Sequence, residues 1–255
     1  MKTLPKWLTA FSAIAILSAT PATADHHAEA DETADPWAGY RAIGNEPFWN
    51  LTLTEGIMRF EHMAVFGASG EQPRPRFTPG GHVFMSTVSS TDGDHSPQAA
   101  VGREFIVLVE DRPCSDSMAG TPYPQTVRVF LAGLHFSGCG GDPIDALAGD
   151  PWTITHLMET PFTGDREISM QFGRDGNVSG SSGCNRYGAS FTMDDGFSFG
   201  PIRSTRMACP GAIGENEQRI FAAMRSVVSI EYEHNGDIVL YSQHGPVLRL
   251  AREPQ

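Results

Sequence analysis

The chain contains almost no lysine. Among its 255 residues the only two lysines are Lys2 and Lys6, and every other permanently charged basic side chain is an arginine. A sequence without lysine beyond its leader cannot use a Schiff-base lysine, a P-loop lysine or a Ser-Lys dyad. Three common routes to catalysis are therefore excluded.

Positive charge of any kind is scarce. Lys and Arg together number 18 against 30 Asp and Glu, a formal net charge of −12, and without the two leader lysines it is −14. Acidic charge spread along a chain gives no electrostatic footprint for phosphate backbones or anionic lipid surfaces. The composition therefore predicts that nucleic acid is not a partner.

Long apolar runs are also missing. The longest, from Trp7 to Leu17, has 11 residues, whereas a membrane-spanning helix needs about 20. It follows the two lysines and precedes the small-x-small site Ala22-Thr23-Ala24, the order of a secretory signal. We predict a signal peptide at 1–24, no transmembrane anchor, and a periplasmic or secreted protein that begins at Asp25.

Catalytic motifs are absent as well. The sequence has no GxSxG, HExxH, CxxC, EF-hand or Walker motif, and each of these carries a specific chemistry. Its nine histidines are scattered, apart from the adjacent His26 and His27. His82, His95 and His135 form a site only if the fold brings them together. We therefore expect a protein that is not an enzyme.

Residues 25–36 carry five acids and no apolar residue larger than alanine, which predicts a disordered acidic tail. Cleavage after Ala24 places a free amine on Asp25, followed by His26 and His27. The amine, two amide nitrogens and the His27 imidazole can surround Cu(II) or Ni(II) in a plane, a geometry that both ions favour. Solvated histidines in a disordered tail are the alternative.

Two globular units are expected after the tail, at 37–148 and 149–255, because the remaining length exceeds a typical single domain. In the first unit, alternating apolar residues predict a β-rich, barrel-like domain. Its strands are expected near 49–53, 57–60, 105–109 and 127–131. Residues 66–102 are rich in Gly, Pro and Ser and are predicted to form long loops.

The second unit is predicted to be an antiparallel sheet with one packed helix, so that the whole protein is α+β and mainly β. Arg174-Asp175-Gly176 is typical of a hairpin turn. Apolar residues at helical spacing predict a helix over 215–228. Two closing strands are expected at 238–241 and 247–250.

Three features of the second unit occur together in a known family. They are the run Gly-Ser-Ser-Gly-Cys-Asn-Arg-Tyr-Gly at 180–188, Ser-Thr-Arg-Met-Ala-Cys-Pro at 204–210, and the Glu-led helix that follows. In motif order and spacing, residues 149–251 resemble a META domain of the HslJ type. The resemblance implies a small envelope or secreted module linked to stress tolerance and virulence, without established catalysis. It also implies a fold similar to a lipid-binding pilot protein of secretion systems. HslJ-like proteins often carry a lipid-anchored cysteine at the cleavage site, where this chain has none.

The first unit resembles an uncharacterised family of envelope proteins over about 41–141. Its marks are Gly-Asn-Glu-Pro-Phe-Trp at 44–49, Cys-Ser-Asp-Ser-Met-Ala-Gly at 114–120 and Gly-Cys-Gly at 138–140. That resemblance implies no function. The four cysteines allow three connectivities, and an oxidising compartment favours bridges. Both resemblances place two cysteines in each unit, which predicts the pairs Cys114–Cys139 and Cys184–Cys209.

Four residues of these motifs are candidates for binding. Glu46 and Trp49 form a ligand-facing pair, unless Trp49 belongs to the core. Asn185 either binds a ligand or satisfies loop amides, and Arg206 is the best binding candidate of the second unit. We expect a non-catalytic binding or stress-protective envelope module whose partner is an envelope protein, a lipid or a glycan. A periplasmic inhibitor of lysozyme-type enzymes and a hydrolase that uses loop carboxylates are the alternatives.

Overall fold

The computed structural model describes residues 35–63, 65–93, 98–162, 166–194, 196–233 and 235–252. The predicted signal peptide and the predicted metal site at Asp25, His26 and His27 lie outside these residues, as does His95. Almost all of the predicted acidic tail does so too. None of the described helices is long and apolar enough to cross a membrane.

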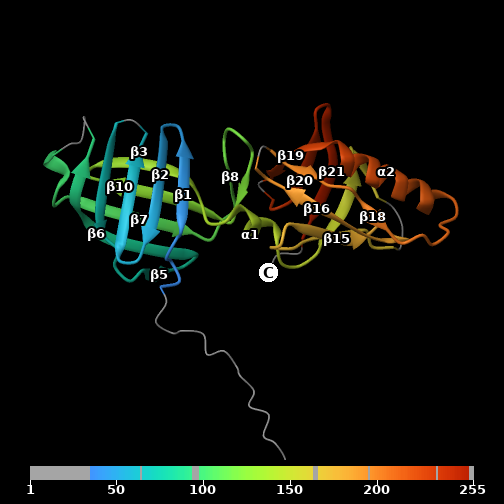
Figure 1. Cartoon of the computed structure of the whole chain (residues 1–255), viewed down its shortest axis with the longest axis horizontal. Helices are drawn as coiled ribbons and strands as arrows, with labels where there is room; N and C mark the ends of the chain where they lie inside the picture. The colour runs from blue at the N-terminus through green and yellow to red at the C-terminus, as the bar shows by residue number, and fades with distance from the viewer. Residues whose placement is uncertain are drawn as a thin grey trace, which may run out of the picture. The chain divides into compact units, whose positions relative to one another are not determined.

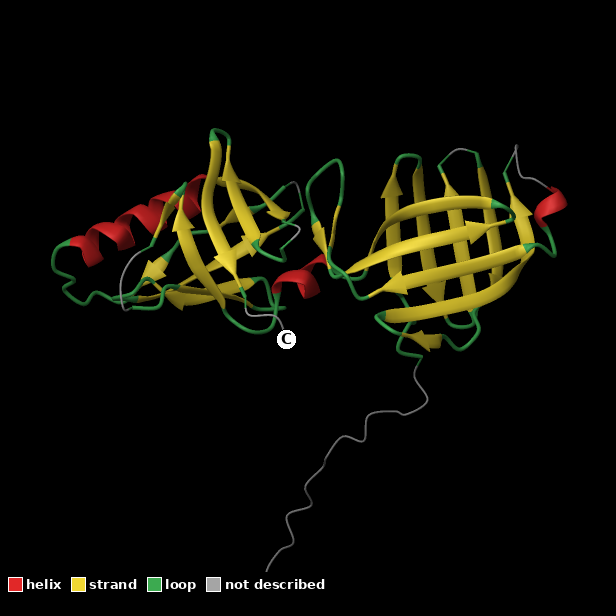
Figure 2. Cartoon of the chain, turned by 180° about the vertical axis from the view of Figure 1, so that it is seen from behind, coloured by secondary structure: helices red, strands yellow, loops and turns green. Residues whose placement is uncertain are grey.

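The N-terminal part is a closed antiparallel barrel of eight strands (Figures 1 and 2). Around the barrel the strands follow the order β4-β3-β2-β1-β11-β10-β7-β6, and pairing of β4 with β6 closes the ring. The barrel-like domain expected from the alternating pattern is therefore confirmed. The strands are β1 (Arg41–Asn45), β2 (Phe48–Thr54), β3 (Ile57–His62), β4 (Phe66–Glu71), β6 (Gly81–Asp92), β7 (Glu104–Glu110), β10 (Gln125–Leu131) and β11 (Leu134–Gly140).

Smaller elements decorate the barrel. They are strand β5 (Arg76–Thr78), which pairs with β6, the 3-10 turn Gln98–Ala100, and the short hairpin of β8 (Cys114–Ser115) and β9 (Pro122–Tyr123).

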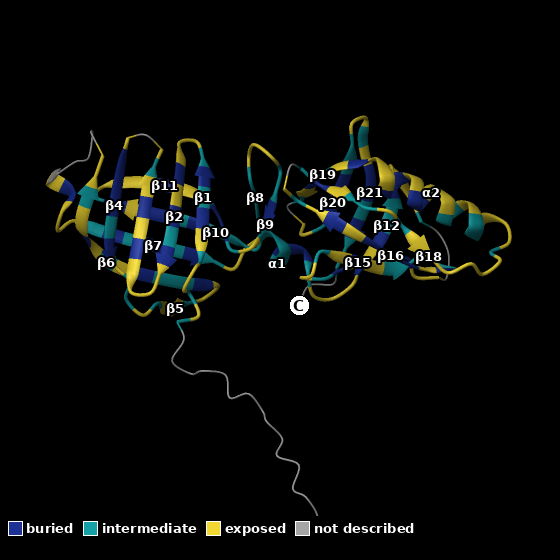
Figure 3. Cartoon of the chain, viewed as in Figure 1, coloured by how far each residue is buried: buried dark blue, intermediate teal, exposed yellow. Residues whose placement is uncertain are grey.

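Side chains fill the inside of the barrel. Buried and exposed positions alternate along its strands, as Figure 3 shows, and in β2 the inward residues are Trp49, Leu51 and Leu53. An eight-stranded barrel is just wide enough for side chains to fill. The interior is therefore a packed core, whose largest fully buried members are Trp49, Phe60, Phe84, Phe105, Leu51, Leu53, Met58 and Leu131.

The prediction of long loops over 66–102 is wrong. Most of this segment is strand, in β4, β5 and β6. Gly70 reflects close approach between neighbouring strands, because a Cβ there would lie 2.7 Å from the carbonyl oxygen of Thr87, whereas Gly80 and Gly102 have positive φ angles in turns. Composition suggested turns, but the small residues are needed where backbones meet.

The C-terminal part is an antiparallel sheet with one long helix, α2 (Ala212–Ser226). Its main order is β17-β16-β15-β14-β12-β21-β20-β19, with β13 beside β12 and β18 beside β16. The strands are β12 (Trp152–Leu157), β13 (Thr160–Pro161), β14 (Ser169–Phe172), β15 (Asn177–Ser181), β16 (Arg186–Thr192), β17 (Ser198–Phe199), β18 (Arg203–Ser204), β19 (Val227–Tyr232), β20 (Ile238–Ser242) and β21 (Gly245–Ala251).

Helix α2 begins three residues earlier and ends two residues earlier than predicted. Ile220 and Met224 are fully buried against the sheet, as the apolar spacing predicts. Val227 and Val228 do not continue the helix but open β19. Two adjacent β-branched residues favour a strand over a helix, and the backbone of Val227 is already extended.

A short helix, α1 (Pro143–Leu147), occupies the segment where Gly and Pro predicted only a break. Side chains of the C-terminal part take up its last carbonyl groups. The indole nitrogen of Trp152 donates to the Leu147 carbonyl at 2.9 Å, and Arg252 donates to the same oxygen at 2.8 Å. The guanidinium carbon of Arg252 also lies 3.9 Å from the ring centre of Trp152. These contacts attach α1 to the C-terminal sheet.

Candidate binding cleft

A cleft of about 540 Å³ opens in the C-terminal part beside the first turn of α2. We call it the α2 cleft. Four segments that are distant in sequence supply its walls: β12, the residues before β14, the loop after β15 and the start of α2. The lining residues are Thr153, Ile154, Thr155, Phe162, Arg166, Glu167, Ile168, Ser182, Gly183, Ile213 and Asn216.

The α2 cleft combines an apolar floor with a polar rim. Ile154 and Ile168 belong to the hydrophobic core, and Phe162 packs against that core. On the rim, the exposed Arg166 donates a hydrogen bond of 3.1 Å to the Gly183 carbonyl. Such a mixture of apolar surface and a few polar groups is typical of small-molecule sites.

Asn185 holds one wall of the α2 cleft in place. The residue is only 2% exposed. Its amide oxygen accepts hydrogen bonds from the Thr205 hydroxyl at 2.7 Å and the Met207 amide at 2.8 Å, and its amide nitrogen donates to Glu217 at 3.1 Å. Asn185 therefore joins the loop after β15, the segment before α2, and α2 itself.

Ser182 completes this network. Its hydroxyl is hydrogen-bonded to the carboxylate of Glu217 and accepts from the amide of Asn185 at 3.1 Å. A buried polar network of this kind is stabilising when its members are satisfied. Asn185 and Ser182 therefore support the wall of the cleft, which agrees with the interpretation that Asn185 satisfies the loop.

Both cysteine pairs lie at disulfide distance, in the pairing that the sequence predicts. Cys184 is bonded to Cys209, so the loop of Asn185 is linked covalently to the segment before α2. Cys114 is bonded to Cys139 and links β8 to β11. Within the described residues no cysteine is free.

The other candidates from the sequence lie away from the α2 cleft. Arg206 is exposed on the segment before α2 and is not one of the residues that line the cleft. Arg166, Ile213 and Asn216 do line it, and none of them was singled out from the sequence. Only the fold shows that the segment before β14 and the start of α2 meet.

Glu46 and Trp49 do not form one site. Trp49 is 1% exposed inside the barrel, stacked on Phe60 with ring centres 5.7 Å apart. Glu46 lies in the exposed turn between β1 and β2, where the Glu46–Pro47 peptide bond is cis. Packing explains why this motif combines a glycine with a tryptophan. A Cβ on Gly44 would lie 2.1 Å from the indole nitrogen of Trp49.

The barrel histidines do not converge. His82 packs beside Trp37 and Phe77, whereas His135 is exposed next to Phe130. In the part of the chain that the structure describes, no group of three or more His, Cys, Asp or Glu is placed to hold a metal ion.

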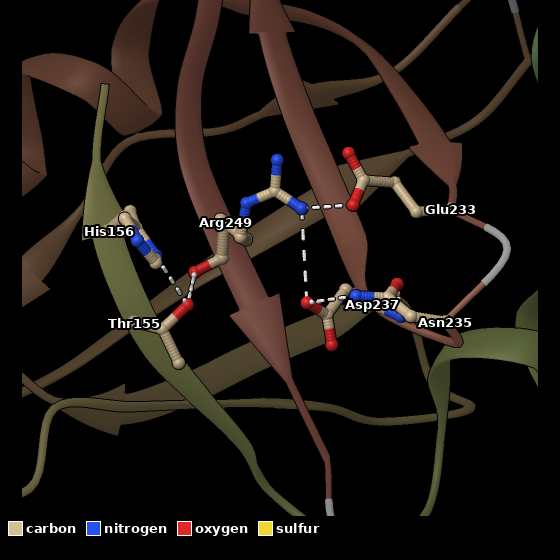
Figure 4. Close-up of polar contacts among 6 residues, drawn as sticks. All are labelled: Thr155, His156, Glu233, Asn235, Asp237 and Arg249. Atoms are coloured by element: carbon tan, nitrogen blue, oxygen red, sulfur yellow. Dashed lines mark hydrogen bonds and ion pairs between the residues drawn. The ribbon is translucent and has the colours of Figure 1, made fainter. Parts of the chain in front are cut away.

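A second polar cluster lies on β12, β21 and the β19–β20 hairpin, and its groups satisfy one another (Figure 4). Arg249 forms an ion pair with Glu233 and lies 3.8 Å from Asp237, which accepts from Asn235 at 2.9 Å. The hydrogen bond to Glu233 raises the pKa of Arg249. Thr155 donates to the Arg249 carbonyl at 3.3 Å, which connects this cluster to the rim of the α2 cleft.

The C-terminal part is a small α+β domain, because one helix packs on its antiparallel sheet. A disulfide and hydrogen bonds fix its loop after β15. Residues 145–255 match the model of the META domain family, so a META domain is present there. The match begins within α1, whose carbonyl groups the domain's own side chains take up.

Two solved structures are similar to part of the chain. An NMR structure of a protein from Burkholderia xenovorans is 23% identical, with 44% of this chain and 87% of that chain covered and a TM-score of 0.36. A second NMR structure is 18% identical, with 42% and 92% covered and the same TM-score of 0.36. No curated protein matches the chain.

Proposed function

We propose that this protein is an exported, non-catalytic binding protein whose α2 cleft takes up a small amphipathic ligand. The observation that carries the proposal is the cleft itself, with its apolar floor and polar rim. Its volume of about 540 Å³ lies in the range of roughly 300–1,000 Å³ that is typical of ligand sites. The predicted signal peptide and the two disulfide-bonded pairs support an extracytoplasmic location.

The lining predicts which chemistry the ligand carries. An alkyl group would pack between Phe162 and Ile213 over the buried isoleucines of the floor. The rim carries one cation, Arg166, beside one carboxylate, Glu167, and the Arg166 guanidinium would bind a carboxylate or phosphate head group through paired hydrogen bonds. A single-chain amphiphile with an anionic head fits both requirements.

The Ser182 hydroxyl, one of three hydroxyl groups in the lining of the cleft, is not arranged as a nucleophile. Ser182 is 1% exposed, and its hydroxyl is engaged with Glu217 and Asn185. A nucleophile needs access to its substrate as well as an adjacent base; Ser182 has the Glu217 carboxylate beside it but is too buried to reach a substrate. The geometry therefore supports a structural role for this serine and binding as the role of the cleft.

Calorimetric titration of the protein lacking residues 1–24 tests the proposal. The probes are octanoate, with an anionic head, and octyl glucoside, with a neutral one. The Ile213→Asp variant places a charge on the apolar side of the cleft and should weaken both probes at least tenfold. Val228→Asp, at a position 41% exposed on β19, is the matched control and should bind like the wild type.

Arg166→Gln should weaken octanoate binding and leave octyl glucoside binding unchanged. The proposal is overturned if neither probe binds with saturation, or if Ile213→Asp binds both as well as the wild type. Slowing of a c-type or g-type lysozyme that survives Ile213→Asp would instead support the inhibitor alternative.

A further inference from the structure

The face of β14, β15 and β16 that points away from the hydrophobic core carries small polar residues and two arginines. Met170, Val178 and Tyr187 point into the core, so the residues that alternate with them lie on the opposite side of the sheet. Register aligns Gln171, Ser179, Gly188 and Arg203 across four neighbouring strands. We call this surface the outer face, and it consists of Ser169, Gln171, Asn177, Ser179, Ser181, Arg186, Gly188, Ser190 and Arg203.

Two adjoining hollows lie on the outer face. One, of about 470 Å³, is lined by Arg186 together with Gln171 and Ser181, and the other, of about 500 Å³, is lined by Arg203 and Asn177. Ser179 lines both, so the hollows follow β15 from end to end, a span of about 13 Å at the usual rise per residue. Neither shares a lining residue with the α2 cleft.

The two arginines have no carboxylate partner among the described residues. Arg174 pairs with Asp145 and Arg249 with Glu233, whereas most arginines of the META domain form no ion pair within the described residues. The outer face holds these two arginines and no carboxylate, although the chain has 30 acids and 16 arginines. In the sheet register Arg203 on β18 lies opposite Gly188 on β16, and Gly188 is two residues beyond Arg186 on the same face. Two guanidinium groups on neighbouring strands of one face attract an anion that bridges them.

We propose that the outer face binds a short segment of a carboxylate-bearing glycan. The guanidinium groups of Arg186 and Arg203 match carboxylates bidentately, and the serine hydroxyls of the outer face offer both donors and acceptors to sugar hydroxyls. The one aromatic residue in the lining, Tyr187, is buried with only 4% exposed. The surface therefore lacks the stacking platform on which nucleic-acid bases are held.

Gly188 provides a way to block the outer face without disturbing the strand. A Cβ at this position would meet only the Val178 carbonyl oxygen, at 3.6 Å, an ordinary contact. Valine favours strands, so Gly188→Val should leave the melting temperature unchanged or raise it. Its side chain would stand on the floor between the two arginines and exclude a ligand.

Titration of the protein lacking residues 1–24 with oligogalacturonate tests this inference, with maltoheptaose as the uncharged glycan. Oligogalacturonate should bind with saturation, and affinity should fall at least tenfold in Gly188→Val and in the Arg186→Gln/Arg203→Gln double variant. Arg225→Gln, on the exposed surface of α2, should bind like the wild type, and maltoheptaose should not bind.

Three results would overturn the inference. They are no saturable binding of oligogalacturonate, unchanged affinity in the double variant, or a loss of affinity in Arg225→Gln equal to that in the double variant. The last result would indicate non-specific electrostatic attraction. Because the lining residues are distinct, none of these results bears on octanoate binding in the α2 cleft.

Discussion

The side-chain amide of Asn185 donates a hydrogen bond of 3.1 Å to the carboxylate of Glu217, which lies 32 residues later in α2. The same asparagine accepts two hydrogen bonds from the segment that precedes the helix. One buried side chain therefore joins the loop after β15, the segment before α2, and α2 itself. Since the loop after β15 and the start of α2 supply walls of the α2 cleft, Asn185 holds two of these walls in position.

Replacing Asn185 with aspartate should destabilise the META domain by about 3 kcal/mol at pH 7, because a buried carboxylate would face Glu217 without a proton between them. Repulsion from Glu217 raises the folded-state pKa of the introduced carboxyl group. The unfolded carboxylates titrate near pH 4, so stability is retained below that pH and lost as pH rises. Urea unfolding at pH 4 and pH 7 should show a smaller deficit at pH 4.

The control for this prediction is Gln243→Glu in the turn between β20 and β21, where the residue is exposed and little change is expected. An Asn185→Asp deficit equal at both pH values would contradict the role assigned to the Glu217 contact.

Replacing Gly44 with alanine should destabilise the barrel by about 2 kcal/mol, because the new methyl group forces the buried Trp49 indole to move. Without displacement that methyl group would lie 2.1 Å from the indole nitrogen. In a Trp49→Phe background the smaller ring removes this contact, so the cost of Gly44→Ala should fall. Unfolding of the four proteins in guanidinium measures the coupling, and strictly additive effects would show that the motif's glycine does not serve the tryptophan.

The sequence predicts the barrel better than it predicts the cleft. Alternation in β2 at Trp49, Leu51 and Leu53 indicates strands, since one face of each strand must be buried. The strands within 66–102 were missed, because a glycine such as Gly70 is required by the close approach of a neighbouring strand, which composition does not reveal. The α2 cleft was missed for a related reason: Thr155, Arg166 and Ile213 meet only in three dimensions.

Loss of the bridge between Cys184 and Cys209 should cost the META domain about 3.5 kcal/mol, since it closes a loop with a sequence separation of 25 and the chain-entropy model gives that value. The double serine variant should unfold at lower urea concentration than the wild type. Peptide mapping of the oxidised protein should recover Cys114–Cys139 and Cys184–Cys209. A peptide that joins Cys139 to Cys184 would contradict the pairing.

The protein should lose stability in alkali as its tyrosines ionise. Burial raises the pKa of Tyr40 and Tyr187 and raises that of Tyr232 to about 12. Unfolded tyrosine titrates near pH 10, so the stability that these neutral phenols contribute is complete below pH 10 and is lost as pH rises through the folded-state values. Phenolate absorbance of the folded protein should rise at higher pH than that of a guanidinium-unfolded control. Coincident titration curves would show that the tyrosines are not buried.

The most direct test of the binding account is to locate a bound amphiphile by NMR. In a titration of the nitrogen-15-labelled protein lacking residues 1–24 with octanoate, the account predicts saturable shifts at the amides of Thr155, Gly183, Ile213 and Asn216. The barrel amides should not move. Shifts confined to the barrel, or shifts at none of the residues that line the α2 cleft, would contradict it.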